Sequence, residues 1–299
     1  MIDKVESQKS KVKSLCGLGT ALITPFTADG SVDFQALARL LDTQLTGKVD
    51  YIVVLGTTGE AATMSADEKR EVRQFIVHYV NGRLPLVLGV GGNNTAAVCA
   101  ELADMKDELV NNYAAILSVC PYYNKPNQEG LYQHFCAVAE ASPIPVILYN
   151  VPGRTGVNLL PETVMRIYEA QPEKIVGIKE ASGIVEQIKH LIDLASMRDF
   201  MVISGDDGIA CEIMEAGGAG LISVASNAFA EDFWDIVHKK DQAKQAQYEQ
   251  IVRLLFKEGN PVGIKAVLAQ KGIIQNYLRL PLVPASKELQ EEIKKEMVK

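Results

Sequence analysis

Short, continuously apolar runs recur along the chain and predict its strands. Each run has four to six residues without polar alternation, which is typical of parallel strands covered on both faces. The stretches between the runs have helical periodicity, as in residues 65–80 and 95–110. Ser65 and Glu68 have the spacing of a capping box, which marks a helix start. The runs begin at Leu18, Tyr51, Leu86, Ala114, Val146, Ile175, Met201 and Gly220.

The number and spacing of these runs predict a closed (β/α)8 barrel. Eight strand–helix units recur at intervals of about thirty residues, the last of them shorter. A doubly wound open sheet is the competing arrangement, with fewer strands and a nucleotide-binding loop early in the chain. The barrel is predicted over residues 15–240, after a polar leader at 1–14.

The last part of the sequence predicts a small helical domain at 241–299. From residue 231 the pattern contains helices only, at 230–240, 242–257 and 261–272, and a charged helix follows from Ser286. Pro261 stands at a helix start, where its missing N–H costs nothing.

Composition and charge narrow the class of protein. The chain has 299 residues, of which 47% are hydrophobic and 22% charged, as in a globular protein. Its net charge of −7 argues against a nucleic acid or an anionic membrane as partner. No apolar run reaches the roughly 20 residues that span a bilayer, and the leader lacks the apolar core of a secretory signal. The five cysteines contain no C-x-x-C pair, so we expect free thiols in a cytoplasmic protein, without a zinc site or disulfides.

In a barrel, catalytic residues lie at the carboxyl ends of the strands. Lys179 is the strongest candidate for a catalytic residue among these positions. It directly follows the apolar residues 175–178, which places a lysine inside a mouth built of apolar groups. Desolvation disfavours the ammonium and favours a neutral amine that can attack a carbonyl. The alternative is a structural ion pair with Glu180 or Asp206.

Three other strand ends carry groups that suit the same chemistry. Tyr149 can move the protons that imine formation requires, although a tyrosine here can also be rim packing. Thr57 and Thr58, flanked by glycines, offer hydroxyl and N–H donors to a carboxylate, or simply form a tight turn. Arg154 suits bidentate capture of a second carboxylate, or is an ordinary surface arginine.

Other polar motifs are assigned no chemistry. The glycine-rich residues 89–93 lack the lysine of a phosphate loop and are predicted to be a turn after the third strand. Asp206 and Asp207 have no third ligand for a metal, and they fit a helix N-terminus better. Cys120 has no histidine partner and is expected to be a packing residue. All four histidines fall in helical stretches, at His78, His134, His190 and His238.

Taken together, the motifs resemble the dihydrodipicolinate synthase and N-acetylneuraminate lyase family of pyruvate-dependent aldolases. The resemblance spans residues 18–284 and rests on five motifs in order at five strand ends. They are GTTGE at 56–60, PYYN at 121–124, YNVPGRTG at 149–156, GIKE at 177–180 and SGDD at 204–207. The resemblance implies a lyase in which no metal or organic cofactor takes part.

By this resemblance, Lys179 would form a Schiff base with pyruvate. Tyr149 would be the proton donor and acceptor beside it, linked to Thr57 and Tyr123 in a hydroxyl relay. In the family the second tyrosine of the pair enters from a neighbouring subunit, so Tyr123 would complete a partner's site. Family enzymes of this kind are usually homotetramers, with two tight dimers joined weakly.

The same resemblance assigns the substrate contacts. Thr58, Gly205 and the backbone at Ile222 would hold pyruvate, and Arg154 would bind the carboxylate of L-aspartate 4-semialdehyde. Thr57-Thr58, the paired tyrosines and Arg154 favour the branch that makes 4-hydroxy-tetrahydrodipicolinate, on the diaminopimelate pathway to lysine, over the sialate lyases. A relative that uses another aldehyde, or a non-catalytic barrel that binds a keto acid, remains the alternative. A binder would need the shape of the site but not the relay.

Some members of the family are inhibited by lysine, and the residues here predict little or no such feedback. The sensitive pattern has histidines at the positions of Ala66 and Lys69 and a glutamate at that of Ala97. Tyr122 and Asn93 are retained. Loss of the carboxylate removes a partner for the ammonium of the effector, and Lys69 adds a like charge.

Overall fold

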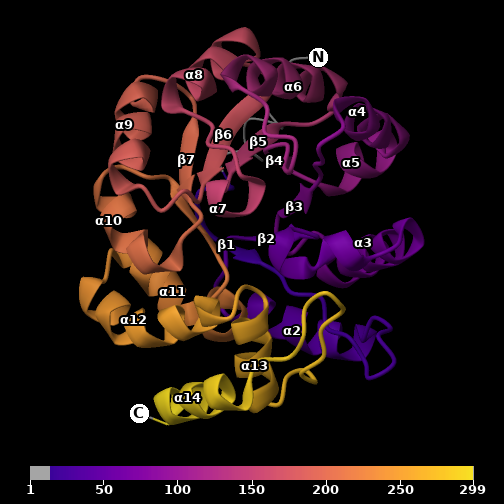
Figure 1. The fold of residues 1–299 in the computed structure, drawn as a ribbon, viewed down its shortest axis with the longest axis vertical. Coiled ribbons are helices and arrows are strands. Elements are labelled where there is room, and N and C mark those ends of the chain that lie inside the picture. The colour runs from indigo at the N-terminus through magenta and orange to yellow at the C-terminus, as the bar shows by residue number, and fades with distance from the viewer. Residues whose placement is uncertain (1–13, 299) are drawn as a thin grey trace. The chain divides into compact units, whose positions relative to one another are not determined.

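Eight parallel strands form a closed barrel in sequence order, β1 to β8, in the computed structural model, which describes residues 14–298 (Figure 1). The predicted barrel class is therefore confirmed, and the open sheet is excluded. The strands are β1 (Gly17–Ala21), β2 (Tyr51–Val54), β3 (Leu86–Gly89), β4 (Ala115–Val119), β5 (Val146–Asn150), β6 (Ile175–Glu180), β7 (Met201–Ser204) and β8 (Gly220–Ser223).

The strands coincide with the apolar runs because they are covered on both faces. Every residue of β1, β2, β5, β7 and β8 is buried. A strand with only one buried face would alternate apolar and polar residues instead. Figure 1 shows helices α4 (Thr95–Asp104), α6 (Gln128–Ala141), α8 (Pro161–Ala170) and α9 (Val185–Ala195) on the outer side of strands β3 to β7.

The helices between the strands follow the predicted periodicity, with one correction. Ser65 caps α3 in a complete capping box with Glu68. The helix predicted at 95–110 is instead two helices that meet at Met105. Leu102 and Leu109 are both fully buried, so the apolar pattern continues across the break and hides it. The helices of this part are α2 (Phe34–Thr46), α3 (Ala66–Val80), α4 (Thr95–Asp104), α5 (Lys106–Asn112), α6 (Gln128–Ala141), α7 (Pro152–Thr155), α8 (Pro161–Ala170), α9 (Val185–Ala195) and α10 (Ala210–Glu215).

Four further helices follow β8, as the sequence predicts. They are α11 (Ser226–Lys239), α12 (Gln242–Lys257), α13 (Val262–Gln270) and α14 (Lys287–Met297). Helix α11 begins earlier than predicted and is kinked at Phe229, whose φ and ψ are −137° and 47°. Pro261 and Ser286 stand at the starts of α13 and α14.

The described chain divides into two compact units. The central unit contains residues 85–222 and the described residues up to Gly17, and the terminal unit contains residues 18–84 and those from Ser223 onward. The predicted domain boundary at 240/241 stays a prediction. The predicted leader, apart from Ser14, lies outside the described residues.

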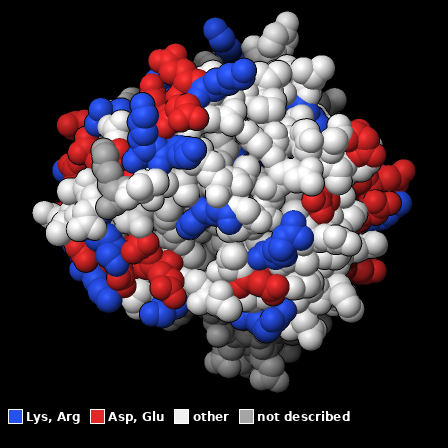
Figure 2. Space-filling model, turned by 90° about the horizontal axis from the view of Figure 1, so that it is seen from below, with Lys and Arg blue, Asp and Glu red and all other residues white. Residues whose placement is uncertain are grey.

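Charged side chains of both signs are interspersed on the face drawn in Figure 2. Neither sign forms a continuous field there, and uncharged residues separate the charged groups (Figure 2). Among the described residues, no helix is long and apolar enough to cross a membrane.

Candidate active site

In the central unit, Lys179 and Tyr149 face each other from neighbouring strands. The parallel register of β5 and β6 pairs Tyr149 with Lys179 directly. Both residues are buried, with 7% of Tyr149 and 6% of Lys179 exposed. The Lys179 Nζ lies 4.5 Å from the centroid of the Tyr149 ring. A primary amine is thus held in an apolar setting beside a phenol, which is the arrangement that nucleophilic attack on a carbonyl with proton transfer requires.

Gly205 supplies the space that the Lys179 side chain occupies. A Cβ atom at this position would lie 2.9 Å from Cε of Lys179 and 2.7 Å from Cβ of Ala181. The N–H of Gly205 donates a hydrogen bond of 2.7 Å to the carbonyl of Glu180. The absence of a side chain therefore lets the end of β7 approach the end of β6 at the reactive lysine. The structure thus places Gly205, a predicted substrate contact, against the side chain of Lys179.

The opposite faces of the same strand ends carry a buried polar network. Asn150 and Glu180 alternate with Tyr149 and Lys179, so their side chains point away from the amine. The Nδ2 of Asn150 donates to Oε2 of Glu180 at 2.9 Å, and the N–H of Ser182 donates to Oε1 at 2.7 Å. Burial raises the pKa of Glu180, and these hydrogen bonds oppose the shift.

This network argues against a structural ion pair between Lys179 and Glu180. The Glu180 carboxylate has its partners on the other face of β6. The Oδ1 of Asp206 accepts a hydrogen bond of 2.8 Å from the N–H of Gly208, at the start of a 3-10 helix. Asp206 is therefore a helix cap, as predicted. The role of Asn150 was missed at the sequence level, although an asparagine at the end of an apolar run was the available signal.

The same network holds the loop that carries Arg154. The N–H of Leu159 donates to Oδ1 of Asn150 at 3.0 Å, and Asn158 accepts from Nδ2 at 2.8 Å. The loop begins with the short helix α7, in which Arg154 is exposed. The backbone of the Arg154 loop is therefore fixed to the end of β5, which carries Tyr149.

The loop after β4 presents Tyr123 on the surface of the central unit. Its side chain is 88% exposed, and its φ of 74° lies in the left-handed region. The N–H of Tyr123 donates to the carbonyl of Thr155 at 3.3 Å, which joins this loop to the Arg154 loop. Tyr122 is 44% exposed, and its carbonyl accepts from Nδ2 of Asn93 at 3.1 Å. Within a single described chain, the Tyr123 ring is not packed against Tyr149.

Ile222, in contrast, is wholly inside the central unit. It lies in β8 with none of its surface exposed. Its side chain belongs to the core, so any contact with a ligand would be made by its backbone, as the sequence-level assignment requires.

In the terminal unit, Thr57 and Thr58 form a turn at the end of β2. Residues Thr57–Gly59 are a single 3-10 turn. Thr57 is exposed, whereas only 2% of Thr58 is exposed. The Thr58 hydroxyl accepts a hydrogen bond of 2.9 Å from Nδ2 of Asn260. Asn260 was not singled out from the sequence, because it lies about two hundred residues away with no motif that connects it to the turn.

The remaining candidates behave as packing or capping groups. Cys120 is fully buried, and burial raises the pKa of its thiol, which disfavours the reactive thiolate. Gly91 packs closely on Val119 in the turn after β3, where a Cβ atom would come within 3.0 Å of it. Across residues 14–298, no group of three His, Cys, Asp or Glu side chains is placed to hold a metal ion.

Comparison with known proteins assigns the chain to a family. The model of the dihydrodipicolinate synthetase family matches residues 14–299. The 4-hydroxy-tetrahydrodipicolinate synthase of Flavobacterium psychrophilum is 48% identical over 94% of this chain and 97% of its own length. The crystal structure of dihydrodipicolinate synthase from Thermotoga maritima has a TM-score of 0.90 and 38% identity, over 95% of this chain and 97% of that one.

A second solved structure that resembles the chain contains a ligand. The chloride-inhibited dihydrodipicolinate synthase of Acinetobacter baumannii, complexed with pyruvate, has a TM-score of 0.89 and 38% identity. The match covers 95% of this chain and 98% of that one. The family match over residues 14–299, together with identities up to 48% over most of the chain, is decisive: the chain belongs to the dihydrodipicolinate synthetase family.

Proposed function

We propose that the chain is a 4-hydroxy-tetrahydrodipicolinate synthase, a lyase that condenses pyruvate with L-aspartate 4-semialdehyde. The observation that carries the proposal is the buried pair of Lys179 and Tyr149 at adjoining strand ends, in a chain whose relatives have this name. The reaction belongs to the diaminopimelate route of lysine biosynthesis. A cytoplasmic location is part of the proposal and rests on the cysteine pattern, which favours free thiols.

The chemistry proposed for Lys179 is Schiff-base catalysis. Its amine attacks the ketone carbon of pyruvate, and loss of water gives an iminium ion. The iminium is an electron sink, so a methyl proton leaves and an enamine forms. The enamine carbon then attacks the aldehyde carbon, which forms the new carbon–carbon bond. Finally the amine of the second substrate attacks the iminium carbon, closes the ring and releases Lys179.

Each of these steps moves a proton, and Tyr149 is the proposed donor and acceptor. A hydroxyl relay through Thr57 and Tyr123 would connect Tyr149 to solvent. The 88% exposure of Tyr123 supports a role in a second copy of the chain, since its ring lies outside its own unit's core. We propose a homotetramer built from two tight dimers, in which Tyr123 completes the site of its partner.

The carboxylates of the two substrates are assigned to separate groups. Thr58, with Gly205 and the backbone at Ile222, would hold pyruvate. Arg154 would bind the carboxylate of the semialdehyde, because a guanidinium can engage both oxygens at once. The hydrogen bonds of Asn150 to the Arg154 loop support this role, since they fix the loop to the end of β5, the strand that pairs with that of the reacting amine.

Feedback by lysine is proposed to be weak or absent. Tyr122 and Asn93 are joined by a hydrogen bond in the central unit, but the nearby exposed position 97 is an alanine and offers no carboxylate. A titration of the enzyme with lysine tests this directly. Half-maximal inhibition at sub-millimolar lysine would contradict the proposal.

The function is tested by pyruvate consumption with L-aspartate 4-semialdehyde, run beside N-acetylmannosamine. Consumption with the semialdehyde alone, and its loss in Lys179→Ala, is the expected result. A reaction only with another aldehyde would keep the Schiff base but overturn the role of Arg154. Borohydride reduction in the presence of pyruvate separates an enzyme from a binder, because a non-catalytic barrel would form no adduct on Lys179.

A further inference from the structure

In the terminal unit, the hydroxyl of Thr58 is oriented by a residue of the C-terminal segment. Only 7% of Asn260 and 2% of Thr58 are exposed, and the amide Nδ2 donates to Oγ1 over 2.9 Å. One of the two lone pairs of the hydroxyl oxygen therefore accepts from Asn260, and the hydroxyl hydrogen points away from that amide. A carboxylate is an acceptor only. Asn260 thus orients the Thr58 hydroxyl as a donor, and a carboxylate can accept its hydrogen.

The turn that carries Thr58 is anchored by a second contact from the same segment. Glu60, whose φ is 53°, follows the turn, and its buried carboxylate forms an ion pair with Lys265 of α13. The exposed fractions of the two side chains are 1% and 0%. A left-handed backbone costs a residue with a side chain about 1–2 kcal/mol, so the pair holds a conformation that the turn alone disfavours.

Lys265 remains a cation in this setting. Burial lowers its pKa to about 8, and Glu60 opposes the shift. Its Nζ also donates to the carbonyl of Tyr277 at 3.0 Å and lies 4.2 Å from the centroid of the Phe26 ring. The ammonium thus has hydrogen-bonded and aromatic partners, as a buried charge requires.

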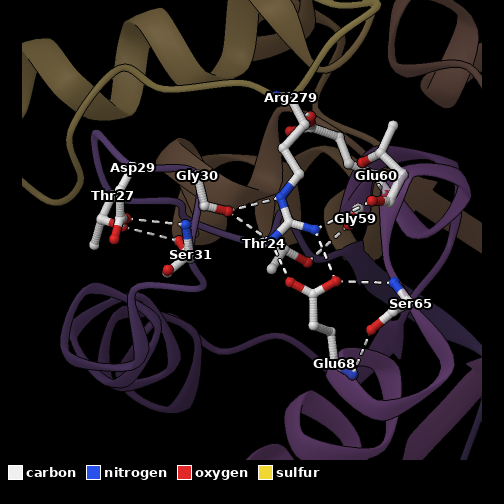
Figure 3. Close-up of polar contacts among 11 residues, drawn as sticks. Thr24, Thr27, Asp29, Gly30, Ser31, Gly59, Glu60, Ser65, Glu68 and Arg279 are labelled. Carbon is white, nitrogen blue, oxygen red and sulfur yellow. Dashed lines mark hydrogen bonds and ion pairs between the residues drawn. The ribbon is translucent and has the colours of Figure 1, made fainter.

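Arg279 adds a third tie between the C-terminal segment and the turn. Its backbone N–H donates to Oε2 of Glu60 at 3.2 Å, and its guanidinium pairs with Glu68 in α3 (Figure 3). The same guanidinium donates to the carbonyls of Gly30 and Thr63, at 2.8 and 3.1 Å from Nε and Nη1. In Figure 3 the arginine lies between the chain around Gly30 and the start of α3, with Glu60 beside it. The residues after the barrel therefore hold the Thr58 turn from several directions.

We infer that Asn260 is a positioning residue that directs the Thr58 hydroxyl hydrogen to the carboxylate of the bound keto acid, on a turn fixed by Glu60 and Lys265. The inference rests on the proposed function, because it takes pyruvate as the ligand of Thr58. It gives the helices after the barrel a part in substrate recognition. Loss of Asn260 should weaken binding of the carboxylate and spare the carbon chemistry at Lys179.

The test compares pyruvate with its uncharged methyl ester as probes of adduct formation. The full-length protein is reduced with borohydride at limiting probe concentration, and the adduct is quantified by mass. Asn260→Ala should lower the preference for pyruvate over methyl pyruvate about tenfold, the contribution of a hydrogen bond to a charged acceptor. The isosteric Asn260→Asp should lower it further, because an aspartate accepts the Thr58 hydrogen. In turnover, KM for pyruvate should rise about tenfold while kcat stays within about threefold.

The matched control is Gln270→Ala, at the end of α13, the helix that begins shortly after Asn260. The Nε2 of Gln270 donates to the carbonyl of Gln290 at 2.8 Å. The control variant therefore loses one hydrogen bond of a side-chain amide, far from Thr58 in the sequence. The preference for pyruvate over methyl pyruvate should not change in Gln270→Ala. If the wild type is active and both Asn260 variants keep its preference for pyruvate over methyl pyruvate, the inference is overturned and the proposed function stands. A wild type that forms no adduct overturns the proposed function, and the inference with it.

Discussion

Adding a single methyl group at Gly205 should disable the reactive lysine. In Gly205→Ala the new Cβ would lie 2.9 Å from Cε of Lys179, 2.7 Å from Cβ of Ala181 and 3.2 Å from the carbonyl oxygen of Glu180. Carbon atoms in favourable contact are about 3.5–4.0 Å apart, so Lys179 must move by roughly 0.6–1 Å. A displacement of about 1 Å from the productive geometry can cost about 10²-fold in rate.

That loss corresponds to about 2.7 kcal/mol in the activation free energy. The assay is kcat/KM for pyruvate consumption with L-aspartate 4-semialdehyde, together with the rate of borohydride-trapped adduct on Lys179. Both rates should fall, because the displaced amine is the nucleophile in both. Thermal unfolding of the variant serves as the check on folding, since overpacking costs about 1–3 kcal/mol of stability.

A second variant identifies which clash matters. Ala181→Gly in the Gly205→Ala background removes the contact with the Ala181 side chain and leaves the contact with Lys179. We expect the double variant to remain impaired. Recovery of activity in the double variant, or a single variant within about threefold of the wild type, would refute the reasoning that Gly205 makes room for the amine.

Three further predictions concern buried polar groups. Burial lowers the pKa of His134 to about 4, so between about pH 6.5 and 4 the unfolded chain binds a proton that the folded chain does not. The melting temperature should therefore fall as the pH is lowered through that window, and it should fall less steeply in His134→Gln. Asn150→Ala removes one amide donor of Glu180 and the acceptor of the buried Leu159 N–H, and it should lower the melting temperature by several degrees, since a buried unsatisfied group costs about 1–3 kcal/mol; an unchanged melting curve would contradict the buried network. Lys265→Met leaves Glu60 buried without its cation and should lower the melting temperature by on the order of 10 °C, because breaking such a pair costs about 3–5 kcal/mol; adding Glu60→Gln should recover part of the loss.

The sequence alone determined the fold class and identified the candidate site residues of the central unit. Apolar runs identify strands buried on both faces, because each residue's environment there depends mainly on local burial. Lys179 stood out for the same reason, as a charge that directly follows such a run. Its pairing with Tyr149 then follows from the parallel order of strands β5 and β6, which the structure confirms.

Only the tertiary structure decided how these groups are supported. Asn260 reaches Thr58 across 202 positions, and Lys265 reaches Glu60 from a helix that the sequence pattern treats as a separate appendage. The break at Met105 was hidden as well, because the buried face continues through it. Contacts between residues so far apart leave no periodicity or spacing in the sequence. They are fixed by how the chain packs, and packing is a property of the folded molecule.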